Sequence, residues 1–191
     1  MWTFDYTAHR AFVAPAAEKS QIWRLIVGMI LIVGVFIGLG SLIYTFIFQA
    51  LTSLSVGIDV ANVLSLLFSF GAASVGVFAT VYFVHNCQPG VIFGPIRATL
   101  AHFYLVALAM TALLVALAVL PPWGFDEPLI ANRAFWPWLL VLPIALISVL
   151  IQTSAEEILF RGYLQQHLGA RFSSPWIWMV LPSVLFGFAH Y

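Results

Sequence analysis

The chain has 191 residues, of which 63% are hydrophobic and only 7% charged, and its formal net charge is zero. A soluble globular domain carries about 25% charged residues, so this chain could not cover its own surface in water. The scattered basic residues exclude a nucleic-acid patch, and membrane lipid is the expected surrounding. Cys87 is the single cysteine, which excludes a disulfide framework and a Cys-x-x-Cys metal clip.

The first part of the chain predicts a short tail followed by three spanning helices. Residues 1–24 form a polar and aromatic tail, expected in the cytoplasm or at the membrane interface. Leu25–Phe48 has no charged residue and is longer than the apolar core of a signal peptide, so it predicts a retained span. Further apolar runs predict helices from about Val63 to Val84 and from about Thr99 to Leu120.

Two more helices are predicted in the remainder of the chain. An apolar run begins near Trp136 and continues into a polar stretch that ends at Glu157, and Pro175 starts the last helix. The fold class is therefore all-α: a multi-spanning bundle with five spanning segments, in one transmembrane domain over residues 25–191. The last helix rises only ~24 Å, short of the ~30 Å hydrocarbon core, so we expect the sequence to be incomplete there.

Two features concern how the helices lie in the membrane. Gly34 and Gly38 form a Gly-x-x-x-Gly pair that would let another helix approach, although such pairs are common by chance. With the amino terminus in the cytoplasm, Arg133 is the one basic residue outside. The inner segments then hold Arg10, Lys19, Arg24, Arg97, Arg161 and Arg171. The positive-inside rule favours this orientation.

Ionisable residues beside the fourth apolar run mark a candidate site, because charge inside a membrane is costly and is usually functional. Glu156 and Glu157 are adjacent, and Arg161 follows Glu157 by four residues, so Glu157 and Arg161 share a helix face and can pair. Glu156 points about 100° away and lacks that partner. His190 is the candidate partner of Glu156, with Phe186 one turn before it on the same face.

The positions of these residues relative to the connecting turn favour a contact. Glu156 is 13 residues before Gly169, and His190 is 15 residues after Pro175. If the fourth helix continues to Gly169, the two side chains lie ~20 and ~22 Å from the turn; a break at Gly162 would weaken this match. A carboxylate facing an imidazole in a wet cavity can orient and deprotonate water. The simpler alternatives are a glutamate pair at the membrane surface and a histidine that only packs between helices.

Taken together, Glu156-Glu157-x-x-x-Arg161 and Phe186-x-x-x-His190 resemble the CPBP (CAAX prenyl endopeptidase and bacteriocin-processing, or Abi) family of intramembrane proteases, over residues 136–191. The resemblance implies a CAAX-protease-like endopeptidase of a bacterial plasma membrane, acting on a membrane-associated peptide or protein. It also implies that Glu156 and His190 are catalytic and activate water, with Glu157, Arg161 and Phe186 supporting them.

The resemblance leaves the type of protease open. Members are described as metalloproteases, which makes zinc one option, and a metal-free glutamic mechanism is the other. One Glu and one His are fewer ligands than a zinc site uses. Two functions of other classes also fit these helices: a non-catalytic scaffold or bacteriocin-immunity protein, and a transporter in which Glu156 and His190 carry protons.

One family feature is missing from this sequence and leads to a prediction. The family has a further His-x-x-x-Asn or His-x-x-x-Asp motif on a later helix, which helps to bind the substrate carbonyl or the oxyanion. Neither pattern occurs in the 191 residues, so the resemblance implies a chain that stops before the last motif. Purified residues 1–191 are expected to show no peptidase activity, and robust turnover of a peptide substrate would refute this.

Overall fold

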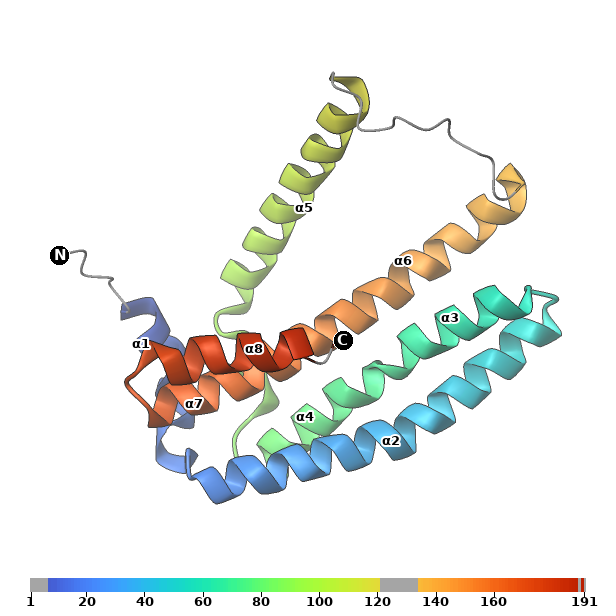
Figure 1. The fold of residues 1–191 in the computed structure, drawn as a ribbon. Coiled ribbons are helices and arrows are strands. Elements are labelled where there is room, and N and C mark those ends of the chain that lie inside the picture. Colours follow the sequence, from blue (N-terminus) through green and yellow to red (C-terminus); the bar gives the residue numbers. More distant parts are fainter. Residues whose placement is uncertain (1–6, 121–133, 189, 191) are drawn as a thin grey trace. The chain divides into compact units, whose positions relative to one another are not determined.

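A computed structural model describes residues 7–120, 134–188 and 190, and every regular element among them is helical. The predicted all-α fold is confirmed (Figure 1). The chain divides into two compact units, Met1–Ile92 with Pro143–Tyr191, and Phe93–Leu142. The first unit holds the residues of the candidate site.

The first unit begins with two short helices, α1 (Thr7–Val13) and the 3-10 helix η1 (Ala14–Lys19), followed by the long helix α2 (Ile22–Ser53). α3 (Ile58–Ser69) and α4 (Gly71–Phe83) run back along α2 (Figure 1). α2 is longer than the predicted 25–48 because helical backbone continues beyond the charge-free run at both ends. Residues 7–19 of the predicted tail are helical, since α1 and η1 both pack against the later helix α7 (Gln165–Arg171).

Small residues let α2 and α4 approach closely, but not at the pair that the sequence suggested. A Cβ atom added at Gly76 would lie 3.1 Å from the Cα atom of Ile32. A Cβ added at Gly34 or Gly38 would meet nothing within 4 Å in the described part of the chain. The close helix approach inferred from the Gly-x-x-x-Gly pair is therefore not found there, because this side of α2 faces away from its neighbours in the unit.

A second long helical stretch carries the glutamates. It consists of α6 (Phe135–Glu157), a π-helical segment η3 (Ile158–Leu164) and α7, and it continues without a break to Arg171. Gly162 therefore does not end the helix; it is buried instead, and an added Cβ there would collide with Ile92. The chain then turns back through a second π-helical segment, η4 (Trp176–Val180), and α8 (Leu181–Phe188), with η4 beside α7 and α8 beside η3.

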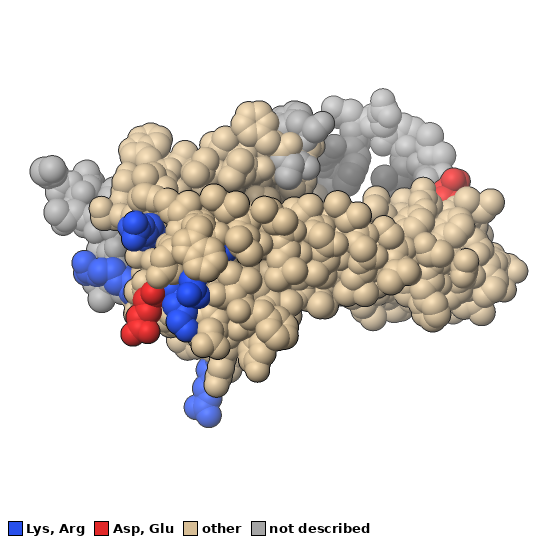
Figure 2. Space-filling view, turned by 90° about the horizontal axis from the view of Figure 1, so that it is seen from below, with Lys and Arg blue, Asp and Glu red and all other residues tan. Residues whose placement is uncertain are grey.

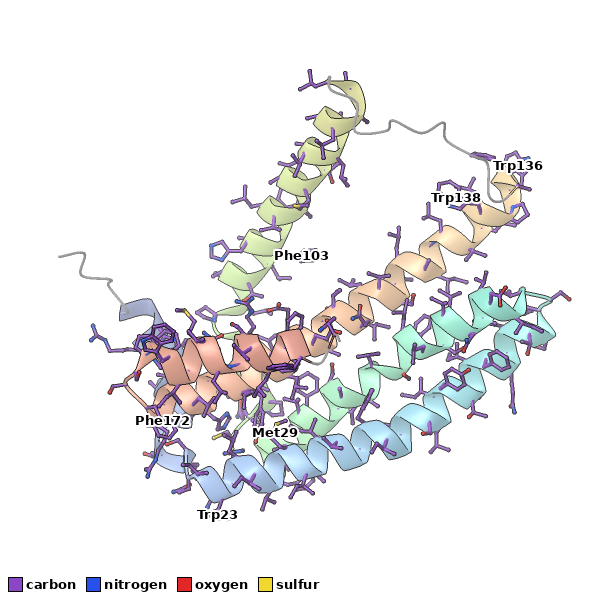
Figure 3. The ribbon with its side chains drawn as sticks, viewed as in Figure 1. Trp23, Met29, Phe103, Trp136, Trp138 and Phe172 are labelled. Atoms are coloured by element: carbon purple, nitrogen blue, oxygen red, sulfur yellow. The ribbon has the colours of Figure 1, made fainter. Side chains whose placement is uncertain are left out.

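The second unit contains α5 (Ile96–Val119) and the first residues of α6. None of the α5 residues is buried, so its apolar side chains are free to face lipid. Trp136 and Trp138 lie exposed in the first turn of α6 (Figure 3), and Trp23 is exposed at the start of α2. Tryptophan side chains near the ends of spanning helices suit the headgroup zone.

The lengths and apolarity of the helices identify a multi-pass membrane protein. The predicted spans correspond to four helical stretches long enough to cross a membrane and one shorter apolar stretch: Ile22–Ser53, Ile58–Phe83, Ile96–Val119, Phe135–Arg171 and, shorter, Trp176–Phe188. On the face shown in Figure 2, the Lys and Arg side chains lie toward one end together with acidic atoms, another acidic side chain lies toward the other end, and the surface between them is drawn without Lys, Arg, Asp or Glu. An uncharged belt of this kind suits the hydrocarbon core.

The contact of α2 with η3 leads to a stability prediction. A Cβ added at Gly28 would collide with the Tyr163 hydroxyl and lie 2.6 Å from the Thr80 methyl. Gly28→Ala is therefore expected to destabilise the protein by about 1–3 kcal/mol through overpacking. Gly34→Ala on the same helix meets nothing, and should leave stability unchanged or raise it through helix propensity. Thermal unfolding in detergent measures both, and equal midpoints for the two variants would contradict the prediction.

Candidate active site

The two adjacent glutamates at the end of α6 have different surroundings. The Glu157 carboxylate is 61% exposed and lies 3.2 Å from Nε of Arg161, which is 69% exposed. The Glu156 carboxylate is only 15% exposed. The i, i+4 spacing that suggested the Glu157–Arg161 pair therefore corresponds to a contact at the surface. Glu156 faces the neighbouring helix α8 instead.

The segment after the glutamates is a π-helix rather than an α-helix. η3 carries Arg161, Gly162 and Tyr163, and the last two are buried. π-helical turns are rare and often occur at functional sites. Nothing in the apolar pattern of the sequence distinguishes this segment from an ordinary helix, so sequence reasoning missed it.

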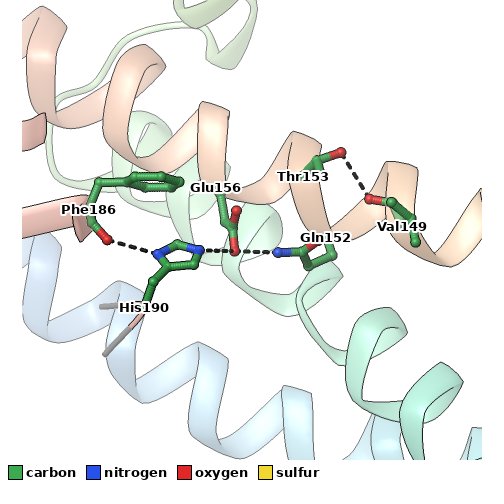
Figure 4. A network of polar contacts seen from close by, with 6 residues as sticks. All are labelled: Val149, Gln152, Thr153, Glu156, Phe186 and His190. Carbon is green, nitrogen blue, oxygen red and sulfur yellow. Dashed lines mark hydrogen bonds and ion pairs between the residues drawn. The ribbon is translucent and has the colours of Figure 1, made fainter. Parts of the chain in front are cut away.

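His190, just beyond α8, meets Glu156 across the helical hairpin (Figure 4). Its Nε2 atom lies 3.6 Å from Oε1 of Glu156. Its Nδ1 atom lies 2.8 Å from the carbonyl oxygen of Phe186, which can only accept, so Nδ1 carries the hydrogen. In the neutral ring, Nε2 therefore presents a lone pair toward the carboxylate. The structure brings together the two residues that the sequence proposed.

The 3.6 Å separation is longer than a direct hydrogen bond, and it suits a shared water. A water oxygen about 2.8 Å from both Oε1 and Nε2 would lie to one side of the line that joins them. Both atoms would then accept a hydrogen from that water, the carboxylate oxygen one and the imidazole nitrogen the other.

Gln152 also contacts Glu156, and sequence reasoning assigned no role to it. Its amide nitrogen donates to Oε1 of Glu156, one helical turn further along (Figure 4). The signal that could have found this residue was its spacing: an amide four residues before a glutamate lies on the same helix face.

A small open pocket of about 70 Å³ lies between η3 and α8, next to Glu157. Its lining residues are Glu157, Phe160, Arg161, Gln165, Pro182, Ser183 and Phe186. Phe186 connects the pocket to the pair of Glu156 and His190, since its ring lies edge-on to Phe160 at 5.2 Å and 4.4 Å from the ring of His190. The pocket has both polar and aromatic walls.

A cluster of buried histidine and tyrosine side chains lies behind η3. Tyr163, fully buried, donates its hydroxyl hydrogen to Nε2 of His85 at 3.1 Å, and Nδ1 of His85 donates to the carbonyl of Lys19 at 3.0 Å. The ring of His167 lies 4.0 Å from that of His85. No motif singles out these residues in the sequence. The cluster joins η1, the segment after α4, and η3, which are far apart in the chain.

Zinc binding beside Glu156 would need further ligand side chains close to it. Within residues 7–120, 134–188 and 190, no group of three or more His, Cys, Asp and Glu side chains lies together as a metal site. A catalytic zinc site uses three protein ligands and a water, so Glu156 and His190 alone do not fit zinc. The steps proposed for Glu156 and His190 therefore involve no metal ion.

Comparison with known proteins matches the part of the chain that carries this site. Residues 135–191 match the family model described as type II CAAX prenyl endopeptidase, Rce1-like. This region is similar to Rce1-like proteins. The predicted resemblance to CAAX proteases is thereby confirmed, and the matched region contains the predicted site residues Glu156, Glu157, Arg161, Phe186 and His190.

A longer similarity covers most of the chain. The uncharacterized protein YyaK of Bacillus subtilis (strain 168) is 28% identical over 200 residues, which cover 95% of this chain and 64% of YyaK. The chain therefore spans less than two thirds of the length of this relative. No solved structure matches the chain.

The histidine cluster predicts how stability depends on pH. Burial lowers the pKa of His85 below its ordinary value of 6.5; the positive charges of Arg24 and Lys19 act in the same direction, against the hydrogen bond to the Lys19 carbonyl. The unfolded chain then binds the proton first, so stability is full above about pH 6.5 and falls as the pH drops below it. Thermal midpoints in detergent between pH 7.5 and 5 should show this decrease.

A matched pair of variants isolates the contribution of His85. His85→Gln removes the titrating ring and should make the decrease with falling pH smaller. His102→Gln removes an exposed histidine of α5 and should leave the decrease unchanged. A His85→Gln protein with the same pH dependence as the parent would contradict the assignment.

Proposed function

We propose that this protein is an intramembrane endopeptidase of the CAAX-protease type, which hydrolyses peptide bonds with a water activated by Glu156 and His190. The observation that carries the proposal is the 3.6 Å approach of the imidazole Nε2 to the Glu156 carboxylate, inside a helical membrane protein. The Rce1-like match over residues 135–191 supports the reaction class.

In the proposed reaction, Glu156 is the general base and His190 orients the water. The carboxylate takes one proton from the water while the oxygen attacks the peptide carbonyl carbon. The tetrahedral intermediate then breaks its C–N bond, and the proton held by Glu156 passes to the leaving amine. The lone pair on Nε2 of His190 accepts the second hydrogen of the water and so fixes the direction of attack. A positioned general base contributes about 10²–10⁴-fold to such a reaction.

The substrate is proposed to be a membrane-associated peptide or protein that enters the pocket beside Phe186. The pocket is lined by the exposed Glu157–Arg161 ion pair and by Phe186, whose ring lies beside His190, so it offers both aromatic and charged contacts to a peptide. We assign the ion pair a supporting role, because it stabilises the turn of η3 next to Glu156 without contacting the reacting water.

The orientation in the membrane follows from the basic residues. Arg10, Lys19, Arg161 and Arg171 belong to α1, η1, η3 and α7, elements that pack together in the first unit. The positive-inside rule places this end, and with it the pocket, on the cytoplasmic side. We propose the plasma membrane of a bacterium as the location, which agrees with the organism of the relative YyaK.

The test is a pair of variants in the protein expressed from its complete natural reading frame. Glu156→Gln keeps the shape of the side chain but removes the base, and His190→Gln removes the imidazole. Each is expected to lower the cleavage rate by at least about 10²-fold, with folding unchanged. The probe is a synthetic peptide that ends in a prenylated CAAX sequence, in detergent micelles, with product release measured by mass spectrometry.

The matched control is Asp59→Asn, which removes another carboxylate, in the first turn of α3. It should cleave at the parental rate. Full activity of Glu156→Gln would refute the proposal. If the parent cleaves no peptide and Glu156→Gln leaves the cellular phenotype unchanged, a scaffold is favoured. If Glu156→Gln abolishes a proton-coupled flux, transport is favoured.

A further inference from the structure

We propose that Gln152 is a positioning residue for the base: its amide holds one carboxylate oxygen of Glu156 so that this oxygen faces the water shared with His190. The inference rests on the proposed function and adds to it a residue outside the sequence motifs. Two side chains approach a single oxygen, since Oε1 of Glu156 accepts from Gln152 and is also the carboxylate atom nearest to Nε2 of His190 (Figure 4).

The chemistry of the carboxylate explains the arrangement. A carboxylate oxygen only accepts hydrogen bonds and has about two lone-pair positions, so the amide must present its nitrogen. One position on Oε1 accepts the Gln152 hydrogen, and the other faces Nε2 of His190 at 3.6 Å. The amide therefore fixes the rotation of the carboxylate and leaves one lone pair directed at the water.

The neighbouring residue shows that this contact is not the usual behaviour of a polar side chain in an apolar helix. The hydroxyl of Thr153 donates to the carbonyl of Val149 at 2.9 Å, four residues back on its own helix (Figure 4). Such back-bonding satisfies a polar group without any tertiary role. The half-buried Gln152 amide instead extends forward to Glu156.

The charged groups around Glu156 do not replace this donor. Arg161 and Glu157, on η3 and the end of α6, are paired with each other at 3.2 Å on the exposed side. His190, from the end of α8, presents a lone pair in its neutral form and cannot donate. In the described part of the structure, the Gln152 amide is therefore the donor that stabilises the charged form of this carboxylate.

The experiment compares Gln152→Leu, Gln152→Glu and Thr153→Val in the protein expressed from its complete reading frame, with the prenylated CAAX peptide as probe. A hydrogen bond to a charged group contributes enough for about a tenfold fall in kcat in Gln152→Leu, with KM nearly unchanged. Because the charged form of the base loses its donor, the acid side of the pH–rate profile should move to higher pH. Gln152→Glu adds a like charge and should move it further.

The control separates positioning from structure. Thr153→Val should leave kcat, KM and the pH profile unchanged, since its hydroxyl contacts only its own helix. A Gln152→Leu protein that loses thermal stability but keeps the parental pH–rate profile would overturn the inference, because the amide would then be only structural.

A second measurement does not depend on turnover. The infrared carboxylic-acid stretch, assigned to Glu156 by its absence in Glu156→Gln, is followed against pH in the same protein. In Gln152→Leu this band should persist to higher pH than in the parent, and an unchanged titration would overturn the inference. If the parent does not cleave the peptide, the proposed function fails while this titration still decides the role of Gln152.

Discussion

The site depends on one constraint: an ionisable carboxylate inside an apolar helical protein needs polar partners, because its charged form is costly away from water. Glu156, with 15% of its side chain exposed, finds them in Gln152 on its own helix and His190 from the antiparallel one. The hairpin of α6–η3–α7 with η4–α8 provides the second partner. Its geometry matters because a shift of one residue would turn either side chain to another face.

The other side of this hairpin is fixed by contacts that involve the amino-terminal segment. The buried amide of Gln166 donates to the carbonyls of Phe12, at 2.8 Å, and Val91, at 3.1 Å. Tyr163 and His85 extend the same attachment to η1. Buried polar groups in a protein interior are held this way because each unsatisfied one is expensive. Residues 7–19, in α1 and η1, thus belong to the support of η3 and α7, although their composition resembles that of an interfacial tail.

The sequence was informative where one physical quantity dominated. Long apolar runs identify spans because only helices satisfy their own backbone in lipid, and the constant rise of a helix placed Glu156 and His190 at equal depth. It was uninformative where several faces are equally apolar. In α2, apolar residues surround the helix, so composition did not tell that neighbours pack at Gly28, or that Gly76 of α4 lies against Ile32, while an added Cβ at Gly34 meets nothing in the described structure. The contact of Gln152 with Glu156, likewise, is recognised only from the direction of the amide in the structure.

The two adjacent glutamates lie in different surroundings because neighbouring positions of a helix face different directions. A rotation of about 100° per residue places Glu157 outside, where Arg161 neutralises it, and Glu156 inside, where no guanidinium contacts it in the described structure. An arginine partner would hold both carboxylate oxygens and would disfavour proton uptake. A neutral amide holds one oxygen and leaves the other lone pairs available to a water.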